Sequence, residues 1–350
     1  MKISLLPLIF LFLFTTAWSQ ETNNNTKTET NSIPDIPVWY LKTQDKNVNL
    51  FVKEYGVGDT IVVVHGGFGA EHSYLLDAFK DLGKKHHFVF YDQRGSLRSP
   101  APDSLISVNK HVEDIEVLRK ELNIKRLNLV GHSMGTLVSS FYLEKYPEHV
   151  ERLTLLALAY PKTAETEDEE LLFEEQKKLG SEFVSRPEIQ NEIIEEGFDR
   201  DRDSFSSKDT TNDWRIRFAG VNIYNVERWR EVKGGMVFYS QRAGTSAGRS
   251  LPESWNNFKT YKEASVPITI INGTHDFVDI GGKVFSKLSK NIDNVEYVLL
   301  DKAGHNAWID RPDVFYNILE KGLAKKLNDH KAENPQLFVR LLFSQVILNH

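Results

Sequence analysis

The chain has 350 residues, of which 40% are hydrophobic and 26% charged, and its formal net charge is −6. This composition is that of a globular protein with a sizeable core, and the acidic balance argues against nucleic-acid binding. The sequence contains no cysteine, which excludes disulfides and thiolate metal sites.

The first segment has the pattern of an export signal. A short positive start precedes an apolar run over residues 5–14 that is too brief to span a bilayer comfortably, and Ala17-Trp18-Ser19 fits a cleavage site. We therefore expect a signal peptide over residues 1–19, removed after Ser19, rather than an uncleaved anchor. The polar residues 20–34 predict a flexible linker, and the mature protein is expected to be periplasmic or secreted.

Strand and helix patterns alternate along most of the remaining chain. Antiparallel strands are expected near residues 36–40 and 49–55, and the alternation that follows predicts a mostly parallel sheet flanked by helices on both faces. We expect this α/β core to span residues 35–160 and 263–328. No internal repeat is present.

Two polar turns follow early strands of this core. Residues 65–69 (His-Gly-Gly-Phe-Gly), the glycine-rich turn, follow the β-branched run 61–64. A strand that opens into such a turn is expected where backbone N–H groups face a substrate oxygen. We assign one oxyanion-hole donor to the amide of Gly67, with Phe68 as the alternative donor and a turn without a ligand as the other interpretation. For the second turn, Asp92-Gln93-Arg94, we expect a bracing role beside the site rather than catalysis.

Residues 131–135 (Gly-His-Ser-Met-Gly) lie between the apolar strand 127–130 and a predicted helix over 136–146. Glycines two residues either side of a serine let a strand and a helix approach closely around a strained turn. The N-terminus of the helix would favour the negative charge that develops there. The pattern predicts Ser133 as a nucleophile and the amide of Met134 as the second oxyanion donor.

Residues 161–262 interrupt the alternation and are expected to be helical, and the family resemblance given below implies that they form a cap over the nucleophile. Helices are predicted over residues 167–179, 187–196 and around 221–232. A cap in this place would shape the substrate pocket and exclude water.

The cap sequence is strongly acidic. Residues 161–213 contain 17 Asp and Glu against 7 Lys and Arg, a net charge of −10. This field would draw a cationic group such as a peptide α-amine, although solvated helix faces are the alternative for most of these residues. Glu227, Glu231 and Trp229 are the candidate substrate-binding residues.

Two titratable residues follow the last two predicted strands. Asp276 comes after the apolar strand 267–271, and His305 comes after strand 295–300. Ser133, Asp276 and His305 follow one another along the chain in the order of a serine hydrolase triad. In such a triad His305 would take the proton of Ser133 and return it to the leaving group, while Asp276 fixes the imidazole tautomer. Asp279 is the alternative acid. This chemistry needs neither a metal nor another cofactor.

Together these motifs resemble the proline iminopeptidase (prolyl aminopeptidase) family of the α/β-hydrolase superfamily. The resemblance covers residues 36–325, and its most discriminating motif is the segment DQRG at 92–95, supported by Asp310 and Pro312 behind His305. Phe68, Leu97 and the elbow sequence GHSMG depart from the usual family pattern. The resemblance implies an α/β-hydrolase fold with an inserted cap. It also implies a serine aminopeptidase that cleaves N-terminal residues, proline among them, through an acyl-enzyme.

The sequence leaves other functions open. The turn sequence GHSMG at 131–135 also fits a carboxylesterase or a carbon–carbon bond hydrolase. A non-catalytic binding protein of the same fold is a further alternative. We expect a small peptide substrate, with neither nucleic acid nor stable membrane insertion. The C-terminal extension, residues 329–350, is expected to form either an additional helix or a contact with another subunit, so no oligomeric state is predicted.

Overall fold

The computed structural model describes residues 38–234 and 238–324, all of which belong to one compact unit, Ile33–His350. The predicted signal peptide (1–19), linker (20–34) and C-terminal extension (329–350) lie outside the described residues. Within the described ranges, every helix is too short or too polar to cross a membrane.

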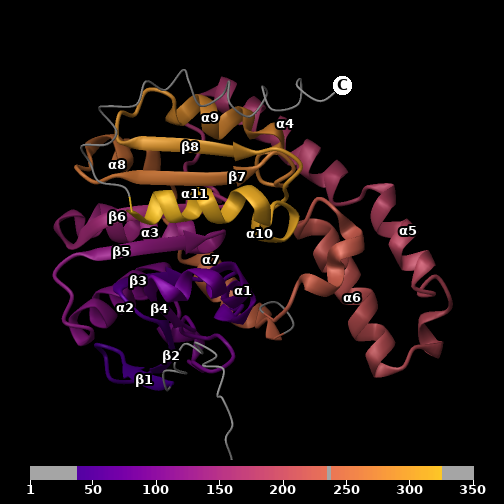
Figure 1. Ribbon diagram of the computed structural model, residues 1–350, viewed down its shortest axis with the longest axis horizontal. Helices are drawn as coiled ribbons and strands as arrows, with labels where there is room; N and C mark the ends of the chain where they lie inside the picture. Colours follow the sequence, from indigo (N-terminus) through magenta and orange to yellow (C-terminus); the bar gives the residue numbers. More distant parts are fainter. Residues whose placement is uncertain (1–37, 235–237, 325–350) are drawn as a thin grey trace, which may run out of the picture. The chain divides into compact units, whose positions relative to one another are not determined.

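The described residues form an eight-stranded sheet with the strand order β1-β2-β4-β3-β5-β6-β7-β8 (Figure 1). The strands are β1 (Trp39–Lys42), β2 (Asn49–Gly56), β3 (Asp59–Val64), β4 (His86–Tyr91), β5 (Leu127–His132), β6 (Val150–Leu156), β7 (Ile268–Gly273) and β8 (Val295–Leu300). Strand β2 pairs antiparallel with both β1 and β4, and the other neighbours pair in parallel. The antiparallel start and the parallel core predicted from the sequence are both confirmed.

The two faces of the sheet are covered by different helices. Successive strand residues point to opposite faces, so in β3 Val62 and Val64 join one apolar cluster while Ile61 and Val63 join the other. The first face is covered by α2 (Val108–Glu121), α3 (Met134–Lys145), α8 (Asn257–Glu263) and α9 (Lys283–Ser289), and the second by α1 (Leu76–Phe79), α10 (Ala307–Asp310) and α11 (Pro312–Ala324). Short 3-10 turns connect these elements: η1 (His72–Leu75), η2 (Lys80–Lys84), η3 (Asp103–Leu105), η4 (Pro147–His149) and η8 (Ile280–Gly282).

The segment between β6 and β7 is helical, as predicted. It contains α4 (Glu167–Phe183), α5 (Pro187–Glu195), η5 (Arg202–Ser204), α6 (Ser207–Asn222), η6 (Val226–Glu231), α7 (Gln241–Arg249) and α8. Figure 1 shows α5 and α6 beyond the carboxyl ends of strands β7 and β8. Apolar side chains of α5, α6 and η6 belong to the same cluster as those of α10 and α11, so the cap interior continues into the second face of the core.

The helix predicted around residues 221–232 is wrong. Helix α6 ends at Asn222, the backbone is extended at Ile223 and Asn225, and only the short turn η6 follows. The buried residues Ile223, Val226, Trp229 and Val232 recur every three positions, which imitates a helical stripe. The prediction also missed α6 itself, which starts with a capping box formed by Ser206 and Asp209.

One arginine joins the helix ends of the cap. The guanidinium of Arg186 donates to the carbonyl oxygens of Phe183 and Gly220 at 2.9 and 2.5 Å, and to that of Ile223 at 2.8 Å. These carbonyls lie at the C-terminal ends of α4 and α6, where no further helical N–H group is available. Arg186 therefore fixes the extended segment that leaves α6.

Helices α7 and α8 pack against the core. Ala243 and Ala247 of α7 and Tyr261 of α8 belong to the apolar cluster on the first face of the sheet. The hydroxyl of Tyr261 lies 2.6 Å from that of Ser140 on α3. The predicted boundary between cap and core at residue 263 thus falls at the end of a helix that already packs on α3.

Candidate active site

Ser133 lies at the turn between β5 and α3. Its backbone has φ 53° and ψ −126°, a conformation that costs a residue with a Cβ on the order of 1–3 kcal/mol. The N–H of Ser133 donates to the carbonyl oxygen of Leu156 at 3.0 Å, which holds the turn against β6. The strained turn predicted from the GHSMG pattern is therefore present.

The glycine after this serine allows the close approach that the turn requires. A Cβ at Gly135 would lie 2.2 Å from the carbonyl oxygen of Val64, at the end of β3. Because that contact involves backbone atoms, neither partner can move away cheaply. Gly135 thus brings the start of α3 against the strand that leads into the glycine-rich turn.

His305 and Asp276 form a buried pair at the carboxyl ends of β7 and β8. Nδ1 of His305 lies 2.9 and 3.0 Å from the two carboxylate oxygens of Asp276, and both side chains are almost fully buried. The Nδ1–H group therefore donates to Asp276, which leaves Nε2 for a second partner. This is the tautomer that a general base requires.

The alternative acid, Asp279, has a different role. Its carboxylate accepts the backbone N–H groups of Val284 and Phe285 at 3.1 and 2.8 Å, at the start of α9. Both aspartates follow the same strand, but Asp276 contacts His305 whereas Asp279 stabilises a helix end.

The histidine loop meets the serine turn through His132. The ring of His132 lies 5.0 Å from that of His305, and its Nε2–H donates to the carbonyl oxygen of His305 at 3.2 Å. No hydrogen bond joins Ser133 to His305 within residues 38–234 and 238–324. His132, the residue before Ser133, therefore makes this contact between the serine turn and the histidine loop.

The glycine-rich turn lies directly against Ser133. A Cβ at Gly66 would come within 2.6 Å of the Cβ of Ser133, and Gly67 has a positive φ of 63°. Met134 is the first residue of α3, so its N–H has no carbonyl partner inside the helix. Phe68 is buried, with its ring stacked 5.7 Å from that of His111. Gly66 and Met134 thus adjoin the serine from two loops, and the roles of the Gly67, Phe68 and Met134 amides as oxyanion donors stay predictions.

The turn after β4 braces the glycine-rich turn, as predicted. The N–H of Gln93 donates to Nε2 of His65 at 3.0 Å, and its side-chain amide donates to the carbonyl oxygen of His65 at 2.7 Å. Arg94 makes two hydrogen bonds with the buried carboxylate of Asp114, at 2.6 and 2.7 Å. The side chains of Gln93 and Arg94 are thus bonded to protein groups, which indicates a structural role rather than contact with a substrate.

Glu71, His72 and Asp92 form a buried group whose ligand atoms lie within 4.8 Å of one another, a spacing that could hold a metal ion. The guanidinium of Arg98 contacts Glu71 at 2.8 Å and Asp92 at 3.0 Å, so a protein cation already pairs with both carboxylates. Burial opposes ionisation of Asp92, but hydrogen bonds and the charge of His72 outweigh it and lower its pKa to about 2.

Helix α7 supports the glycine-rich turn, a role that the sequence analysis missed. The N–H of Ser240 donates to the carbonyl oxygen of Gly69 at 2.8 Å. A Cβ at Gly244 would lie 2.7 Å from the carbonyl oxygen of Phe68. Pairs of small residues recur four positions apart in this helix, at 243–244 and 247–248. This pattern was the sequence signal that could have indicated the close packing.

The candidate substrate-binding residues have other partners or face solvent. The indole N–H of Trp229 donates to the buried carboxylate of Glu192 at 2.8 Å, and its ring fills the cap core. Glu231 is exposed and pairs with Arg228 at 2.7 Å, and Glu227 is exposed. Their role toward a substrate stays a prediction.

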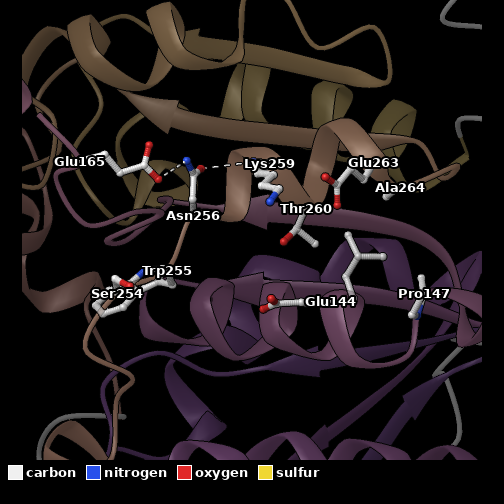
Figure 2. A pocket seen from close by; sticks show the side chains of 11 residues that line it. Glu144, Pro147, Glu165, Ser254, Trp255, Asn256, Lys259, Thr260, Glu263 and Ala264 are labelled. Carbon is white, nitrogen blue, oxygen red and sulfur yellow. Dashed lines mark hydrogen bonds between the residues drawn. The ribbon is translucent and has the colours of Figure 1, made fainter.

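A hollow of about 460 Å³ lies between α3, α8 and the segment that precedes α8 (Figure 2). The side chain of Asn256 donates to Glu165 at 2.9 Å at its edge. Its lining residues include Glu144, Lys259 and Glu263, and none of the predicted site residues. The hollow is therefore distinct from the site around Ser133.

Residues 59–312 match the model of a protein family described as having an alpha/beta hydrolase fold. This stretch includes Ser133, Asp276 and His305. The chain belongs to this alpha/beta hydrolase family. The proline iminopeptidase of Flavobacterium johnsoniae is 24% identical over 316 residues, which cover 84% of this chain and 98% of the relative. The resemblance predicted from the motifs is thus confirmed.

Other similar proteins are named for other reactions. The 1-acylglycerol-3-phosphate O-acyltransferase of Arabidopsis thaliana is 24% identical over 326 residues, 85% of this chain and 75% of the relative. An esterase from Exiguobacterium antarcticum has a similar structure, with a TM-score of 0.59 and 16% identity over 82% of this chain and 99% of the esterase. The likeness to the esterase concerns the fold alone.

Proposed function

We propose that the protein is an exported serine hydrolase that removes N-terminal residues, with proline as the candidate residue, from short peptides. The observation that carries the proposal is the pair formed by His305 and Asp276, with Nδ1 at 2.9 Å from the carboxylate, beside the strained turn of Ser133. Such a pair prepares Nε2 of the imidazole to accept a proton, and a strained turn of this kind is where a nucleophilic hydroxyl is expected.

In the proposed acylation step, Oγ of Ser133 attacks the scissile carbonyl and Nε2 of His305 takes the Oγ proton. The new C–O bond moves the carbonyl electron pair onto oxygen, where the amides of Met134 and Gly67 stabilise it. The C–N bond then breaks, and His305 gives the proton to the leaving amine. Water repeats the sequence on the acyl-enzyme and restores the serine. Asp276 stabilises the imidazolium in both halves.

Two features support a peptide with a free N-terminus as the substrate. The relative with the proline iminopeptidase name aligns over 98% of its length. The cap segment 161–213 has a net charge of −10, and many of its carboxylates, such as Glu167, Asp168 and Glu170, are exposed. A negative field of this kind raises the local concentration of a cationic α-amine.

A carboxylesterase is the second candidate. It is favoured by the elbow sequence GHSMG, which departs from the usual iminopeptidase pattern, and by the esterase of similar structure. The triad chemistry would be unchanged, because ester and amide substrates share the same tetrahedral intermediate.

A set of chromogenic substrates separates the two candidates. Prolyl, alanyl and leucyl amides would be compared with their N-acetylated forms and with a short acyl ester. An aminopeptidase should lose most of its kcat/KM on acetylation, because the α-amine is then neutral. Unchanged turnover of the acetylated amides, or turnover of the ester alone, would reject the aminopeptidase proposal.

The nucleophile is tested separately. Ser133→Ala should reduce kcat by roughly 10⁴–10⁶-fold, and a fluorophosphonate probe should label the wild-type protein only. A wild-type protein that stays unlabelled would favour the binding-protein alternative. Export is tested by cell fractionation with mass spectrometry of the mature N-terminus, for which a start at residue 20 is expected.

A further inference from the structure

A chain of hydrogen bonds crosses the site behind Ser133. The N–H of Gly66 donates to the hydroxyl of Tyr74 at 2.7 Å, and the same hydroxyl lies 2.6 Å from Nδ1 of His132. On its other side, Nε2 of His132 lies 3.2 Å from the carbonyl oxygen of His305. The chain thus links the glycine-rich turn, η1, the end of β5 and the loop after β8.

The partners fix where each proton lies. A carbonyl oxygen only accepts, so Nε2 of His132 must carry a proton and donate it to His305. The hydroxyl of Tyr74 already accepts from Gly66, and its own single proton points to Nδ1 of His132. His132 is therefore neutral, with its proton on Nε2, and every donor in the chain has an acceptor.

The surroundings keep His132 in this form. Its side chain is 2% exposed, and its ring lies 5.2 Å from that of Trp308 and 5.3 Å from that of Tyr74. Burial, together with the charge that His305 carries when protonated, lowers the pKa of His132 well below its usual value. His132 consequently keeps its tautomer while His305 gains and loses a proton during the proposed reaction.

We propose that Tyr74 and His132 are positioning residues that hold the glycine-rich turn and the loop of His305 at one fixed spacing around Ser133. This inference rests on the proposed function, because it assigns the spacing to the serine, the base and the oxyanion donors. It accounts for the histidine of the GHSMG sequence, which the triad does not use. A displacement of about 1 Å in such a site can cost on the order of 10²-fold in rate.

The first test breaks the chain at its hydroxyl. Tyr74→Phe keeps the ring but removes the proton that faces Nδ1 of His132, so the imidazole is free to move its proton and turn a lone pair toward the carbonyl of His305. We expect kcat to fall by roughly 10–10²-fold while KM changes by less than about 3-fold. Tyr316→Phe is the matched control, because the hydroxyl of Tyr316 bonds to the carbonyl of Asp77 on the surface.

The second test uses two amide replacements of His132. In His132→Gln the amide N–H reaches the position of Nε2 and restores the donor to His305, whereas in His132→Asn it reaches only the position of Nδ1. We expect the glutamine variant to keep a kcat at least about 10-fold above that of the asparagine variant. Equal kcat values for two variants that both melt like the wild type would overturn the proposal.

The third test needs no turnover. In a ¹⁵N spectrum of the histidine side chains at pH 7, His132 should be protonated on Nε2 and unprotonated on Nδ1. A proton on Nδ1, or a charged ring, would overturn the proposal even if no variant folds. If the wild-type protein shows the expected tautomer but is not labelled by the fluorophosphonate probe, the proposed function fails instead. Normal labelling with a wild-type kcat in Tyr74→Phe rejects the positioning role alone.

Discussion

The carboxylate of Asp310 accepts a hydrogen bond from the backbone N–H of Gly304, the residue directly before His305, at 2.8 Å. The same carboxylate accepts the N–H groups of Tyr224 and Asn225 at 2.8 and 3.1 Å, where the chain leaves helix α6. One side chain thus fixes both the histidine loop and the exit of the cap.

Asp310→Ala should therefore affect stability and activity together. Three backbone N–H groups lose their acceptor, which should lower the free energy of unfolding by about 2–4 kcal/mol. The looser histidine loop should lower kcat by roughly 10-fold or more. Urea unfolding and steady-state kinetics measure the two effects. Asp313→Ala is the control, since Asp313 is exposed on α11, and similar losses in both variants would contradict this prediction.

Asp276 and Asp279 allow a sharp comparison within one loop. Asp276→Asn leaves His305 without a negative partner, and kcat should fall by about 10⁴-fold with little change in fold. Asp279→Asn should instead lower the melting temperature, because its carboxylate accepts two amides at the start of α9. Circular dichroism and kinetics on both variants distinguish the roles. The assignment of the acid fails if Asp279→Asn is the variant that loses activity.

Two glycines of α7 test the support that this helix gives to the glycine-rich turn. Gly244→Ala would place a Cβ against the hydroxyl of Tyr239 and 2.7 Å from the backbone carbonyl oxygen of Phe68. The tyrosine side chain can move aside, but the turn must shift, and kcat should fall by about 10-fold. At Gly248 a Cβ meets no atom within 4 Å apart from its own helix backbone, and Gly248→Ala should leave kcat unchanged while stability rises by up to about 1 kcal/mol. Kinetics and thermal melting of the pair check both statements, and a similar kcat for both variants would refute the first.

Buried histidines should make the fold acid-sensitive. Burial lowers the pKa of His111 to about 3, and neither ring nitrogen has a hydrogen-bond partner among the described residues. The unfolded chain binds this proton below its usual pKa of 6.5 whereas the folded chain does not, so stability is lost as pH falls from 6.5 toward 3. At pH 5 this one histidine should cost about 2 kcal/mol.

The variant His111→Phe isolates that contribution. Its free energy of unfolding, measured by urea at pH 7 and pH 5, should fall less between the two values than that of the wild type. The ring of phenylalanine can still stack on Phe68, so packing is largely kept. An unchanged pH dependence would show that His111 does not carry the effect.

Local patterns were sufficient to predict the sheet and the serine turn. The apolar run of β5, the two glycines and the helix after Ser133 all lie within one short stretch, where steric rules alone define the geometry. The order of the strands then places Asp276 and His305 at the same edge. What the sequence left open was the choice between Asp276 and Asp279, which follow the same strand and differ only in what they contact.

Other features depend on contacts between distant residues. Tyr74 and His132 are 58 positions apart, and nothing near either residue indicates the other. The segment after α6 has a helical spacing of apolar residues, but Arg186 and Asp310 hold its backbone extended. Tertiary hydrogen bonds therefore override the local pattern there, and a single sequence does not reveal them.

The apolar interior of the cap and the layer formed by α10 and α11 are one continuous cluster. Within the described residues, a movement of the cap away from α10 and α11 as one rigid body would expose this shared interior to water. We therefore expect substrates to enter without a rigid opening of the cap, so that shape and charge at the entrance, rather than a closing movement, decide which of them is bound.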